Sequence, residues 1–385
     1  MALKNLNIVV VGAGIGGLSA AIALRRSGAQ VRVFEQAAEL TEVGAGLQIS
    51  ANGMAVLHAL DILPRGEGGP GLRSAGTVIR DCRSGREVTV MPAPAAGPTY
   101  YFHRADLIDL LRKAAERMGV ELVLGQRVTS CEAEQGGARI EMTDGRAQHA
   151  DLVVAADGGR SLLRRALVGE EGAPRFTGQV AWRATIPWGQ AKADRRATLT
   201  MGPGRHVVTY PIRSGRELNI VAVEERTDWR EEGWRHRGDA AELRSRFAGF
   251  GGDVAHQLGA VTDVYLWALF LHPVASRWQD GRLALVGDAA HPTLPFMAQG
   301  ACLALEDSWV LAHCLTHATD AASGLTRYES ARRDRAQRVV AAAAANARNF
   351  HLRTPMRQLA QLGLSLLGPR IARRYEWIYG HDVTR

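Results

Sequence analysis

The stretch IVVVGAGIGGLSAAIALRRSGAQVRVFEQ, residues 8–36, decides how the chain begins to fold. Gly12, Gly14 and Gly17 stand in the spacing G-x-G-x-x-G, directly after an apolar run and directly before a helix-like run. In this context Gly12 permits a tight strand-to-helix turn, Gly14 lets the backbone approach a pyrophosphate, and Gly17 lets the helix pack close to the sheet. The free N–H groups at the helix start favour an anionic phosphate. The segment predicts a mononucleotide-binding β-α-β unit.

A second apolar run, residues 31–34, predicts the next strand of this unit and ends at Glu35. A carboxylate at this distance from the glycines is placed to accept hydrogen bonds from a ribose hydroxyl. The ligand is therefore expected to be an adenine dinucleotide. FAD and NAD both use this fingerprint, so the segment alone leaves the choice between them open.

Length and composition narrow the class of protein. A chain of 385 residues is long enough for two domains. It contains no apolar run of about 20 residues, so no transmembrane helix is predicted. The N-terminal segment lacks the pattern of a signal peptide. The four cysteines show no CxxC spacing, which argues against a zinc site and structural disulfides and predicts a cytoplasmic protein.

The formal charge of +8 raises the question of a nucleic-acid partner. The basic residues are spread along the chain, and their densest cluster, YESARRDRAQRV at residues 328–339, has mixed charge on a predicted helix. A solvated helix face explains such a cluster better than a nucleic-acid arm. No nucleic-acid partner is predicted, although a positive field can attract anionic substrates or NAD(P)H.

The pattern along the chain alternates between nucleotide-binding and β-rich segments. A hairpin signal follows the first unit, helical periodicity returns, and a long β-rich region runs from about residue 180 to about residue 270. Helical patterns dominate from residue 301 to the end. This order predicts an α/β protein in which a Rossmann-like domain is interleaved with a β-sheet domain and followed by C-terminal helices.

Two further stretches identify the dinucleotide through a resemblance. DLVVAADGGRSLLRRAL, residues 151–167, and GRLALVGDAAHPTLPFMAQGACLALEDSWVLA, residues 281–312, resemble the second and third fingerprints of the FAD-dependent aromatic hydroxylases, the single-component flavoprotein monooxygenases of the p-hydroxybenzoate hydroxylase type. YFHRADL, residues 101–107, is similar to the family segment whose arginine lies beside the flavin. WIYGHDV, residues 377–383, looks like an ending common in the salicylate hydroxylase and 6-hydroxynicotinate monooxygenase branch.

The resemblance implies a discontinuous domain plan and a reaction. The FAD-binding domain is expected at residues 1–71, 98–173 and 272–325, the substrate β-sheet domain at 72–97 and 174–271, and a C-terminal helical segment at 326–385. Members of the family use NADH or NADPH and O2 to hydroxylate a phenolic or heteroaromatic ring through a flavin C4a-hydroperoxide. The chain shows no second dinucleotide fingerprint, in keeping with a nicotinamide that visits only transiently. An epoxidase or oxidase of the same fold and a non-catalytic flavin-binding protein remain as alternatives, and a homodimer is one option for the assembly.

The resemblance also implies the residues that contact FAD. Asp288 is expected to bind the ribityl chain, Asp157 the pyrophosphate, and the N–H groups of Gly300 and Ala301 the pyrimidine edge of the flavin. A helix N-cap at Asp288 and a strand-ending turn at Asp157 are the structural alternatives. The whole expected set is Gly12, Gly14, Ile15, Gly16, Gly17, Glu35, Gln36, Gly46, Arg104, Val128, Asp157, Asp288, Ala298, Gly300 and Ala301, with no metal.

The candidate catalytic residues lie in RHVVTYPIRSGRELNIV, residues 205–221. His206 and Tyr210 are four residues apart, so on a strand they face the same side. In the family this strand forms a wall of the substrate pocket, and a histidine helps to deprotonate the phenol. The pKa of an ordinary histidine suits proton exchange near neutrality. Arg183 pairs either with a substrate carboxylate or with a neighbouring acidic residue.

Three further candidates for substrate contact depart from the patterns of related branches. Gln48 stands where the 6-hydroxynicotinate branch carries histidine, and Pro295 and Phe296 replace polar residues. The pocket is therefore predicted to be more apolar than in those branches. The aromatic substrate is accordingly left as a phenol or heteroaromatic compound, with a larger ring such as a quinolone included.

Overall fold

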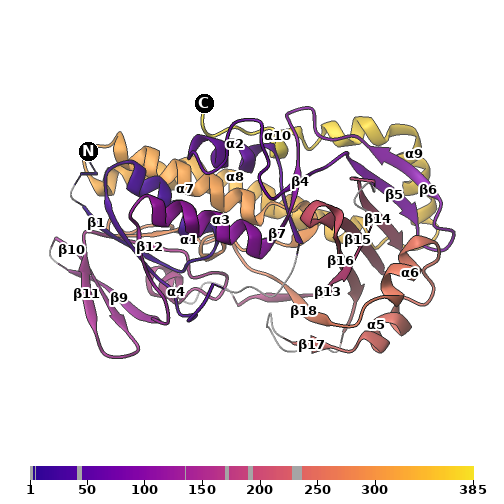
Figure 1. Cartoon of the computed structure of the whole chain (residues 1–385), viewed down its shortest axis with the longest axis horizontal. Coiled ribbons are helices and arrows are strands. Elements are labelled where there is room, and N and C mark those ends of the chain that lie inside the picture. The colour runs from indigo at the N-terminus through magenta and orange to yellow at the C-terminus, as the bar shows by residue number, and fades with distance from the viewer. Residues whose placement is uncertain are drawn as a thin grey trace.

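The computed structural model describes residues 3–4, 6–40, 46–134, 136–169, 173–189, 194–227 and 236–385. Within these ranges the chain forms four β-sheets and a set of helices that continues to the C-terminus (Figure 1). The predicted α/β class is confirmed, with a parallel sheet, separate β-sheets and C-terminal helices. The predicted domain boundaries stay a prediction.

The five-stranded sheet is parallel throughout, in the order β19-β12-β1-β2-β8. Its members are β1 (Asn7–Val11), β2 (Gln30–Phe34), β8 (Glu121–Val123), β12 (Leu152–Ala155) and β19 (Leu283–Leu285). The carboxyl ends of parallel strands meet at one edge, which is where open α/β sheets bind ligands. Since β1, β12 and β19 each end in one of the three glycine-rich fingerprints, the sheet brings all three to this edge.

Helices and one small sheet pack against the parallel sheet, and a second small sheet lies against α2, α3 and α7. Helix α1 contacts β1, β2 and β12 and packs beside α3 and α7. These helices and their neighbours are α1 (Ile15–Arg26), α2 (Ala51–Ala59), α3 (Arg104–Arg117), α4 (Leu162–Val168) and α7 (Gly300–Thr316). One small antiparallel sheet contains β9 (Val128–Glu134), β10 (Gly137–Met142) and β11 (Ala147–Ala150), and the other contains β3 (Gly46–Ile49), β4 (Leu72–Arg73) and β7 (Tyr100–His103).

The largest sheet has eight strands in the order β17-β18-β13-β16-β15-β14-β5-β6. They are β5 (Thr77–Asp81), β6 (Glu87–Met91), β13 (Arg175–Pro187), β14 (Ala197–Gly202), β15 (Arg205–Ile212), β16 (Glu217–Glu225), β17 (Arg237–Gly238) and β18 (Val264–Leu271). One face packs on α5 (Ala240–Arg246) and α6 (Asp253–Gly259) in a core of its own. The opposite face is turned toward the rest of the protein, because side chains alternate along each strand.

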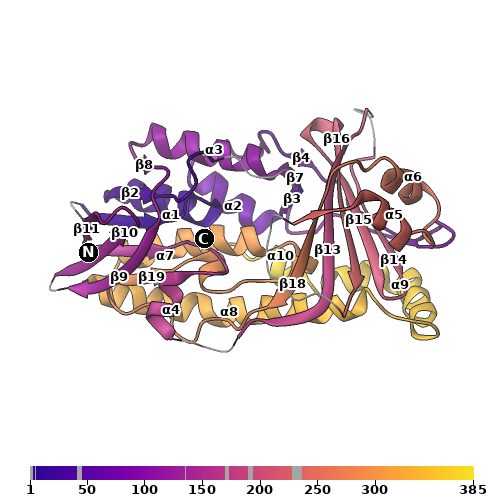
Figure 2. The same ribbon diagram turned by 90° about the horizontal axis from the view of Figure 1, so that it is seen from below.

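The C-terminal helices connect the two large sheets. Helix α8 (Ala321–Asn349) runs beneath both halves of the molecule, and α9 (Met356–Arg373) then reaches β6 at the edge of the eight-stranded sheet (Figures 1 and 2). The remaining elements are α10 (Glu376–Tyr379) and the short 3-10 helices η1 (Arg213–Gly215), η2 (Gly287–Ala289) and η3 (Pro295–Met297). Of the described helices, none has the length and apolarity needed to cross a membrane.

A buried ionic cluster joins α7 to α8. Glu306 and Asp307 on α7 are fully buried, and Arg332 on α8 lies 2.7 Å from a Glu306 oxygen and 2.8 Å from an Asp307 oxygen. Arg335 adds a second ion pair to Glu306 at 2.7 Å. Charges of both signs are thus matched inside the protein, which a buried charge requires.

The same carboxylate also holds the loop that follows β19. Asp307 Oδ2 accepts the backbone N–H of Gly287 at 3.0 Å and lies 2.5 Å from His291 Nε2. Burial opposes ionisation of Asp307, but the charges of His291 and Arg332 outweigh it and lower the pKa of Asp307 from 3.8 to about 2. The loop carrying Asp288 is therefore tied to α7 and α8.

Replacing Asp307 by Asn preserves the shape of this cluster and removes its charge. Removal of one partner from a buried ion pair costs about 3 to 5 kcal/mol, so we expect a large fall in thermal midpoint. Because the folded pKa lies below the unfolded one, the contribution of Asp307 is complete above about pH 4 and is lost as the pH falls toward about 2. Thermal unfolding of the FAD-loaded protein across this range measures both effects.

Asp61→Asn is the matched control, because Asp61 pairs with Arg26 on the surface and its side chain is 77% exposed. Exposed pairs contribute about 1 kcal/mol or less. Equal thermal midpoints for the two variants would contradict a structural role for the buried cluster.

Candidate active site

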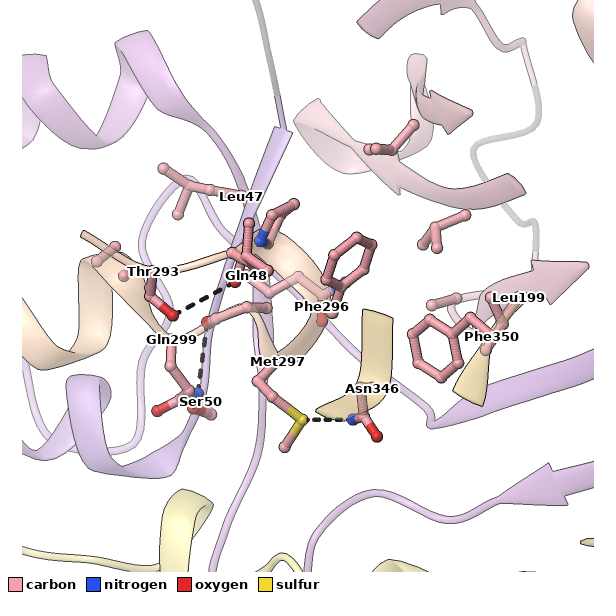
Figure 3. Close-up of a pocket in the computed structure, with 18 of the residues that line it drawn as sticks. Leu47, Gln48, Ser50, Leu199, Thr293, Phe296, Met297, Gln299, Asn346 and Phe350 are labelled. Carbon is pink, nitrogen blue, oxygen red and sulfur yellow. Dashed lines mark hydrogen bonds between the residues drawn. The ribbon is translucent and has the colours of Figure 1, made fainter. Parts of the chain in front are cut away.

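A single cavity of about 1230 Å³ extends from the carboxyl edge of the parallel sheet to the inner face of the eight-stranded sheet. The glycine-rich loops line one end, and His206 and Tyr210 on β15 line the other. Between these ends, Figure 3 shows side chains converging from β3, the segment around η3, β14 and the end of α8.

Most of the predicted site residues line this cavity, although they come from distant parts of the sequence. The lining members are Gly14, Ile15, Gly16, Gly46, Gln48, Arg104, Arg183, His206, Tyr210, Asp288, Pro295, Phe296, Ala298, Gly300 and Ala301. The predicted residues outside the cavity lining are Gly12, Gly17, Glu35, Gln36, Val128 and Asp157.

The three glycines of the first fingerprint serve two different needs. Gly12 has φ +102°, and a Cβ on it would lie 2.4 Å from the carbonyl oxygen of Ala156. A Cβ on Gly17 would lie 1.8 Å from the carbonyl oxygen of Gly12. The fold itself therefore requires glycine at both positions.

Gly14 is different, because nothing within 4 Å would meet a Cβ there. Its φ of −73° and ψ of −175° are open to any residue, and it is the N-cap of the 12-residue helix α1. The space beside Gly14 belongs to the cavity, at a helix end whose first N–H groups have no partner within the helix. A cradle with free donors fits an anionic pyrophosphate.

Two predicted acidic ligands are engaged by the protein itself. Glu35 accepts the backbone N–H groups of Ala13 and Ala37, both at 2.8 Å. Asp157 accepts the Ser161 hydroxyl at 2.5 Å and the backbone N–H of Leu162 at 2.9 Å. Both carboxylates thus shape loops at the edge of the parallel sheet, and the turn role left open for Asp157 is the one its geometry supports.

Val128 and Gln36 lie away from the cavity for different reasons. Val128 begins β9 and is buried in the hydrophobic core beneath the parallel sheet. Gln36 is exposed to solvent after β2. Their predicted contacts with FAD stay predictions.

Asp288 lines the cavity from η2. Its carboxylate has no hydrogen-bond partner among the described residues, which argues against the N-cap alternative. Burial raises the pKa of Asp288, while nearby His291 and Arg104 oppose that effect. An unpartnered carboxylate facing a cavity fits a ligand that brings hydroxyl donors.

The helix that follows presents donors to the same region. Ala298 has φ +52°, a left-handed conformation that turns the chain before α7 begins at Gly300. Gly300 and Ala301 line the cavity, and the first N–H groups of a helix lack partners within it. The cavity therefore offers donors at two helix starts and a carboxylate close to the second, a set that fits a dinucleotide.

The opposite wall of the cavity is the inner face of the eight-stranded sheet. Arg183 lies beside Val221, which lies beside Val208, and all three line the cavity. His206 and Tyr210 stand two residues to either side of Val208 on β15. The predicted common face of His206 and Tyr210 is confirmed.

Arg183 has no carboxylate within ion-pair distance among the described residues. One guanidinium nitrogen, Nη2, donates to the carbonyl oxygen of Gly46 at 2.9 Å, and the group stacks 5.0 Å from the ring centre of Trp267. Its Nε is buried without a partner, and burial lowers the pKa of Arg183. A guanidinium without a counterion in a cavity wall fits an anionic ligand.

The backbone at Gly46 packs closely against this wall. A Cβ on Gly46 would lie 2.7 Å from Asn219 Cγ and 2.8 Å from Tyr210 Cε2. Its N–H also donates to Asn219 Oδ1 at 2.7 Å. Tyr210 in turn stacks on Tyr101 at 4.9 Å, and burial raises the pKa of Tyr210. Tyr210 is therefore a neutral phenol near neutral pH.

His206 lies in an apolar environment, with 1% of its surface exposed. Its ring is flanked by Phe296 and Phe350, with ring centres at 5.6 Å and 5.2 Å. Burial and the neighbouring His351 lower the pKa of His206 well below its usual 6.5. The ordinary histidine pKa that favours proton exchange near neutrality does not carry over to this buried ring, because desolvation disfavours the imidazolium. The ring is neutral and can accept a proton.

Sequence patterns did not reveal several contacts between residues that line the cavity or lie next to it. His351 Nε2 lies 2.8 Å from His206 Nδ1, although the two residues are 145 positions apart. Met297 meets Asn346 through a 2.7 Å contact, and Gln299 donates to Ser50 at 3.0 Å (Figure 3). No local periodicity links these segments, so the contacts become visible only in the folded chain.

The middle of the cavity is apolar. This agrees with the prediction from Pro295 and Phe296, which replace polar residues of related branches. Both lie on η3, and the lining around them includes Leu199, Met297 and Phe350 (Figure 3). Gln48 on β3 contributes a polar group nearby.

Comparison with known proteins places the chain in a family. A family model described as an FAD binding domain matches residues 5–343. The chain is 36% identical to 3-amino-4-hydroxybenzoate 2-monooxygenase of Streptomyces cremeus, over 91% of this chain and 89% of the relative. It is 32% identical to 3-hydroxybenzoate 6-hydroxylase of Polaromonas naphthalenivorans (strain CJ2), over 98% of this chain and 97% of the relative.

The chain belongs to the family of FAD-dependent aromatic hydroxylases. Its fold matches Klebsiella pneumoniae HpxO complexed with FAD and uric acid, with a TM-score of 0.84 and 28% identity over 96% of this chain and 95% of that one. It matches a salicylate hydroxylase substrate complex with a TM-score of 0.83 and 27% identity over 99% of this chain and 97% of that one. The predicted family, FAD as cofactor and the class of FAD-dependent monooxygenase are confirmed.

Gly14→Val tests the cofactor cradle of this hydroxylase. The backbone at Gly14 accepts valine without strain, but the side chain would fill the space expected for the pyrophosphate. We expect a folded protein without FAD, read from its flavin absorbance and circular dichroism. FAD released from the parent protein by heat would show that the cofactor is bound non-covalently.

Gly12→Ala provides the contrast, because its Cβ would meet a backbone oxygen in a left-handed conformation. This variant should lose folded protein as well as flavin. Full FAD occupancy in Gly14→Val would contradict the cradle.

Proposed function

We propose that this monooxygenase hydroxylates the ring of a phenolic or heteroaromatic acid, using NADH or NADPH and one atom of O2. The observation that carries the proposal is Arg183, a guanidinium with no counterion among the described residues, on the same cavity wall as His206. A substrate with a carboxylate at one end and an acidic hydroxyl at the other satisfies both groups.

The spacing of the wall supports one ring between Arg183 and His206. Two strand spacings of about 4.8 Å and two residues of about 3.4 Å separate them, so their Cα atoms lie about 12 Å apart. Both side chains enter the cavity from this face. A guanidinium and an imidazole that reach into the cavity from these two positions would leave room for one hydroxybenzoate ring between them.

The protein contributes binding, orientation and proton transfer to this reaction. Arg183 would hold the carboxylate, and neutral His206 would accept the phenol proton, which makes the ring electron-rich. Phe296 and Phe350 exclude water from the imidazole. Tyr210 stays protonated and would donate a hydrogen bond to the substrate.

The cofactor side of the proposal assigns Gly14 to the pyrophosphate, Asp288 to the ribityl hydroxyls, and the start of α7 to the flavin ring. Bound FAD supplies the redox chemistry between NAD(P)H, O2 and the substrate. The asymmetric cavity keeps these parts at one end and the substrate wall at the other.

The relatives support an aromatic acid as the substrate class. The two compared above are named for 3-amino-4-hydroxybenzoate and 3-hydroxybenzoate, which both carry a carboxylate and a ring hydroxyl. The apolar middle of the cavity and the volume of about 1230 Å³ also leave room for larger ring systems.

Arg183→Met tests the substrate class. NAD(P)H consumption and the product mass would be measured with 3-hydroxybenzoate, 3-amino-4-hydroxybenzoate, salicylate and the same rings without the carboxylate. A hydrogen bond to a charged group contributes about 1.5 to 3 kcal/mol, so KM for an acid should rise about 10-fold to 100-fold in this variant. Turnover of a ring without carboxylate should change little.

Arg183→Lys is the matched control, because it keeps the charge while losing the planar group. It should keep part of the preference for acids. Equal effects of Arg183→Met on acids and on neutral rings would contradict the proposed carboxylate contact. Stimulation by alkenes alone would favour an epoxidase.

His206→Ala tests the proton acceptor. The variant should retain FAD and its reduction by NAD(P)H, because His206 lies at the substrate end of the cavity. Loss of general base assistance should slow hydroxylation at least about 100-fold. The yield of product per NAD(P)H should fall, with hydrogen peroxide taking up the difference.

His149→Ala controls for the loss of a histidine, since the side chain of His149 is 72% exposed and remote from the cavity. This control should match the parent in both rate and yield. Parent-like coupling in His206→Ala would instead make His206 a packing residue.

A further inference from the structure

His206 has a single polar side-chain partner among the described residues. Its Nδ1 lies 2.8 Å from Nε2 of His351, and both side chains are nearly fully buried. The rings of Phe296 and Phe350 also lie beside it, with ring centres at 5.6 Å and 5.2 Å. A proton accepted by His206 at Nε2 can therefore leave only through Nδ1, toward His351.

His351 faces two groups of opposite character through its second nitrogen. Its Nδ1 lies 3.0 Å from Gln179 Nε2 and 3.5 Å from Glu225 Oε1. An amide nitrogen donates and a carboxylate accepts. Gln179 therefore stabilises the tautomer of His351 without hydrogen on Nδ1, and Glu225 stabilises the tautomer with it.

The orientation of the Gln179 amide is set by a second contact. Its nitrogen also donates to the carbonyl oxygen of Ala347 at 3.1 Å. A flipped amide would place oxygen against oxygen, so the nitrogen stays toward His351. Both tautomers of His351 thus have a fixed partner.

Glu225 connects this buried pair to the solvent. Its side chain is 40% exposed, and Oε2 accepts from Arg353 at 2.7 Å, whose side chain is 74% exposed. A carboxylate in this position exchanges protons with water.

Neither imidazole holds an extra proton near neutral pH. Burial lowers the pKa of His351 to about 4, with Arg205 adding to this effect and Glu225 opposing it. Burial and the neighbouring His351 also lower the pKa of His206. A proton entering at one end is therefore matched by one leaving at the other.

We propose that His206, His351 and Glu225 form a proton relay from the substrate hydroxyl to the solvent. The proposal rests on the proposed function, in which the substrate is a phenol. Before transfer, each histidine carries hydrogen on Nδ1, so that His206 donates to His351 and His351 donates to Glu225.

Transfer moves three protons and leaves no imidazolium. The phenol O–H bond breaks as N–H forms at His206 Nε2, His206 Nδ1 gives its hydrogen to His351 Nε2, and His351 Nδ1 gives its hydrogen to the Glu225 carboxylate. His206 then donates to the phenolate, and Gln179 donates to the bare Nδ1 of His351. Glu225 releases the proton to water, and the reverse sequence reprotonates the product and resets the relay.

Tautomer populations in the FAD-loaded protein test the relay without any substrate. With 15N-labelled histidine, two-bond 1H–15N correlations show which nitrogen of each ring carries hydrogen. Glu225→Gln should shift both His206 and His351 toward hydrogen on Nε2, and Gln179→Leu should shift both toward hydrogen on Nδ1. His206→Asn and His351→Asn spectra would assign the two rings.

Arg353→Gln is the matched control, because it breaks the ion pair of Glu225 but keeps its carboxylate. It should leave both tautomers as in the parent. Unchanged tautomers in Glu225→Gln, or a change in His351 without one in His206, would overturn the relay. Glu225 lies at the surface, so its variants test the idea even where Gln179→Leu folds poorly.

Activity gives a second readout. With an aromatic acid that stimulates NAD(P)H use, Glu225→Gln should slow hydroxylation about 100-fold, the lower end of general acid-base assistance, and leave flavin reduction unchanged. Glu225→Asp, which keeps a carboxylate, should recover much of this loss. Parent-like hydroxylation in Glu225→Gln would overturn the relay. Failure of every aromatic compound to stimulate would reject the proposed function, while the tautomer measurement would still decide whether the three side chains are coupled.

Discussion

The carboxylate of Asp307 is the point on which much of the molecule depends. It pairs with Arg332 of α8 and also accepts the N–H of Gly287, at the loop that presents Asp288. A charge buried this deeply is stable only when its partners are held in place. The pairing fixes α8 within its first half, and about 25 Å of helix then separates Arg332 from the end of α8, where His351 follows. One buried interaction thus positions both the cofactor loop and the far wall of the cavity.

Two charged groups in the cavity lining lack a hydrogen-bond donor or a counterion from the described part of the protein. Asp288 has no donor within the described residues, and Arg183 has no counterion there. By contrast, Glu35 and Asp157 each accept two hydrogen bonds from their own loops. The Asp288 carboxylate and the Arg183 guanidinium both face the cavity, and a ligand with hydroxyl donors and an anionic group would complete them.

The part of the cavity around His206 excludes water but still contains a path for protons. Aromatic rings around His206 exclude water and keep the imidazole neutral. Without water, a proton accepted by His206 has no solvent to leave to. The contact with His351 therefore matters, because it gives that proton a way out. Chemistry in an enclosed site needs such an outlet whenever an ionisable substrate changes its charge, and Glu225 provides one at the protein surface.

The α/β class, the family and FAD could be predicted from the sequence, and most of the residues predicted for the site line the cavity, because these features depend on local rules. A left-handed turn at Gly12 needs glycine wherever it occurs, and a period of two places His206 and Tyr210 on one face. The tertiary structure alone decided that Glu35 and Asp157 bind their own backbone, that Val128 lies in the core, and that His351 meets His206. These outcomes depend on burial and on contacts between residues far apart in the chain. Desolvation is likewise a property of the folded interior, and for that reason the low pKa of His206 could not be derived from its neighbours in the sequence.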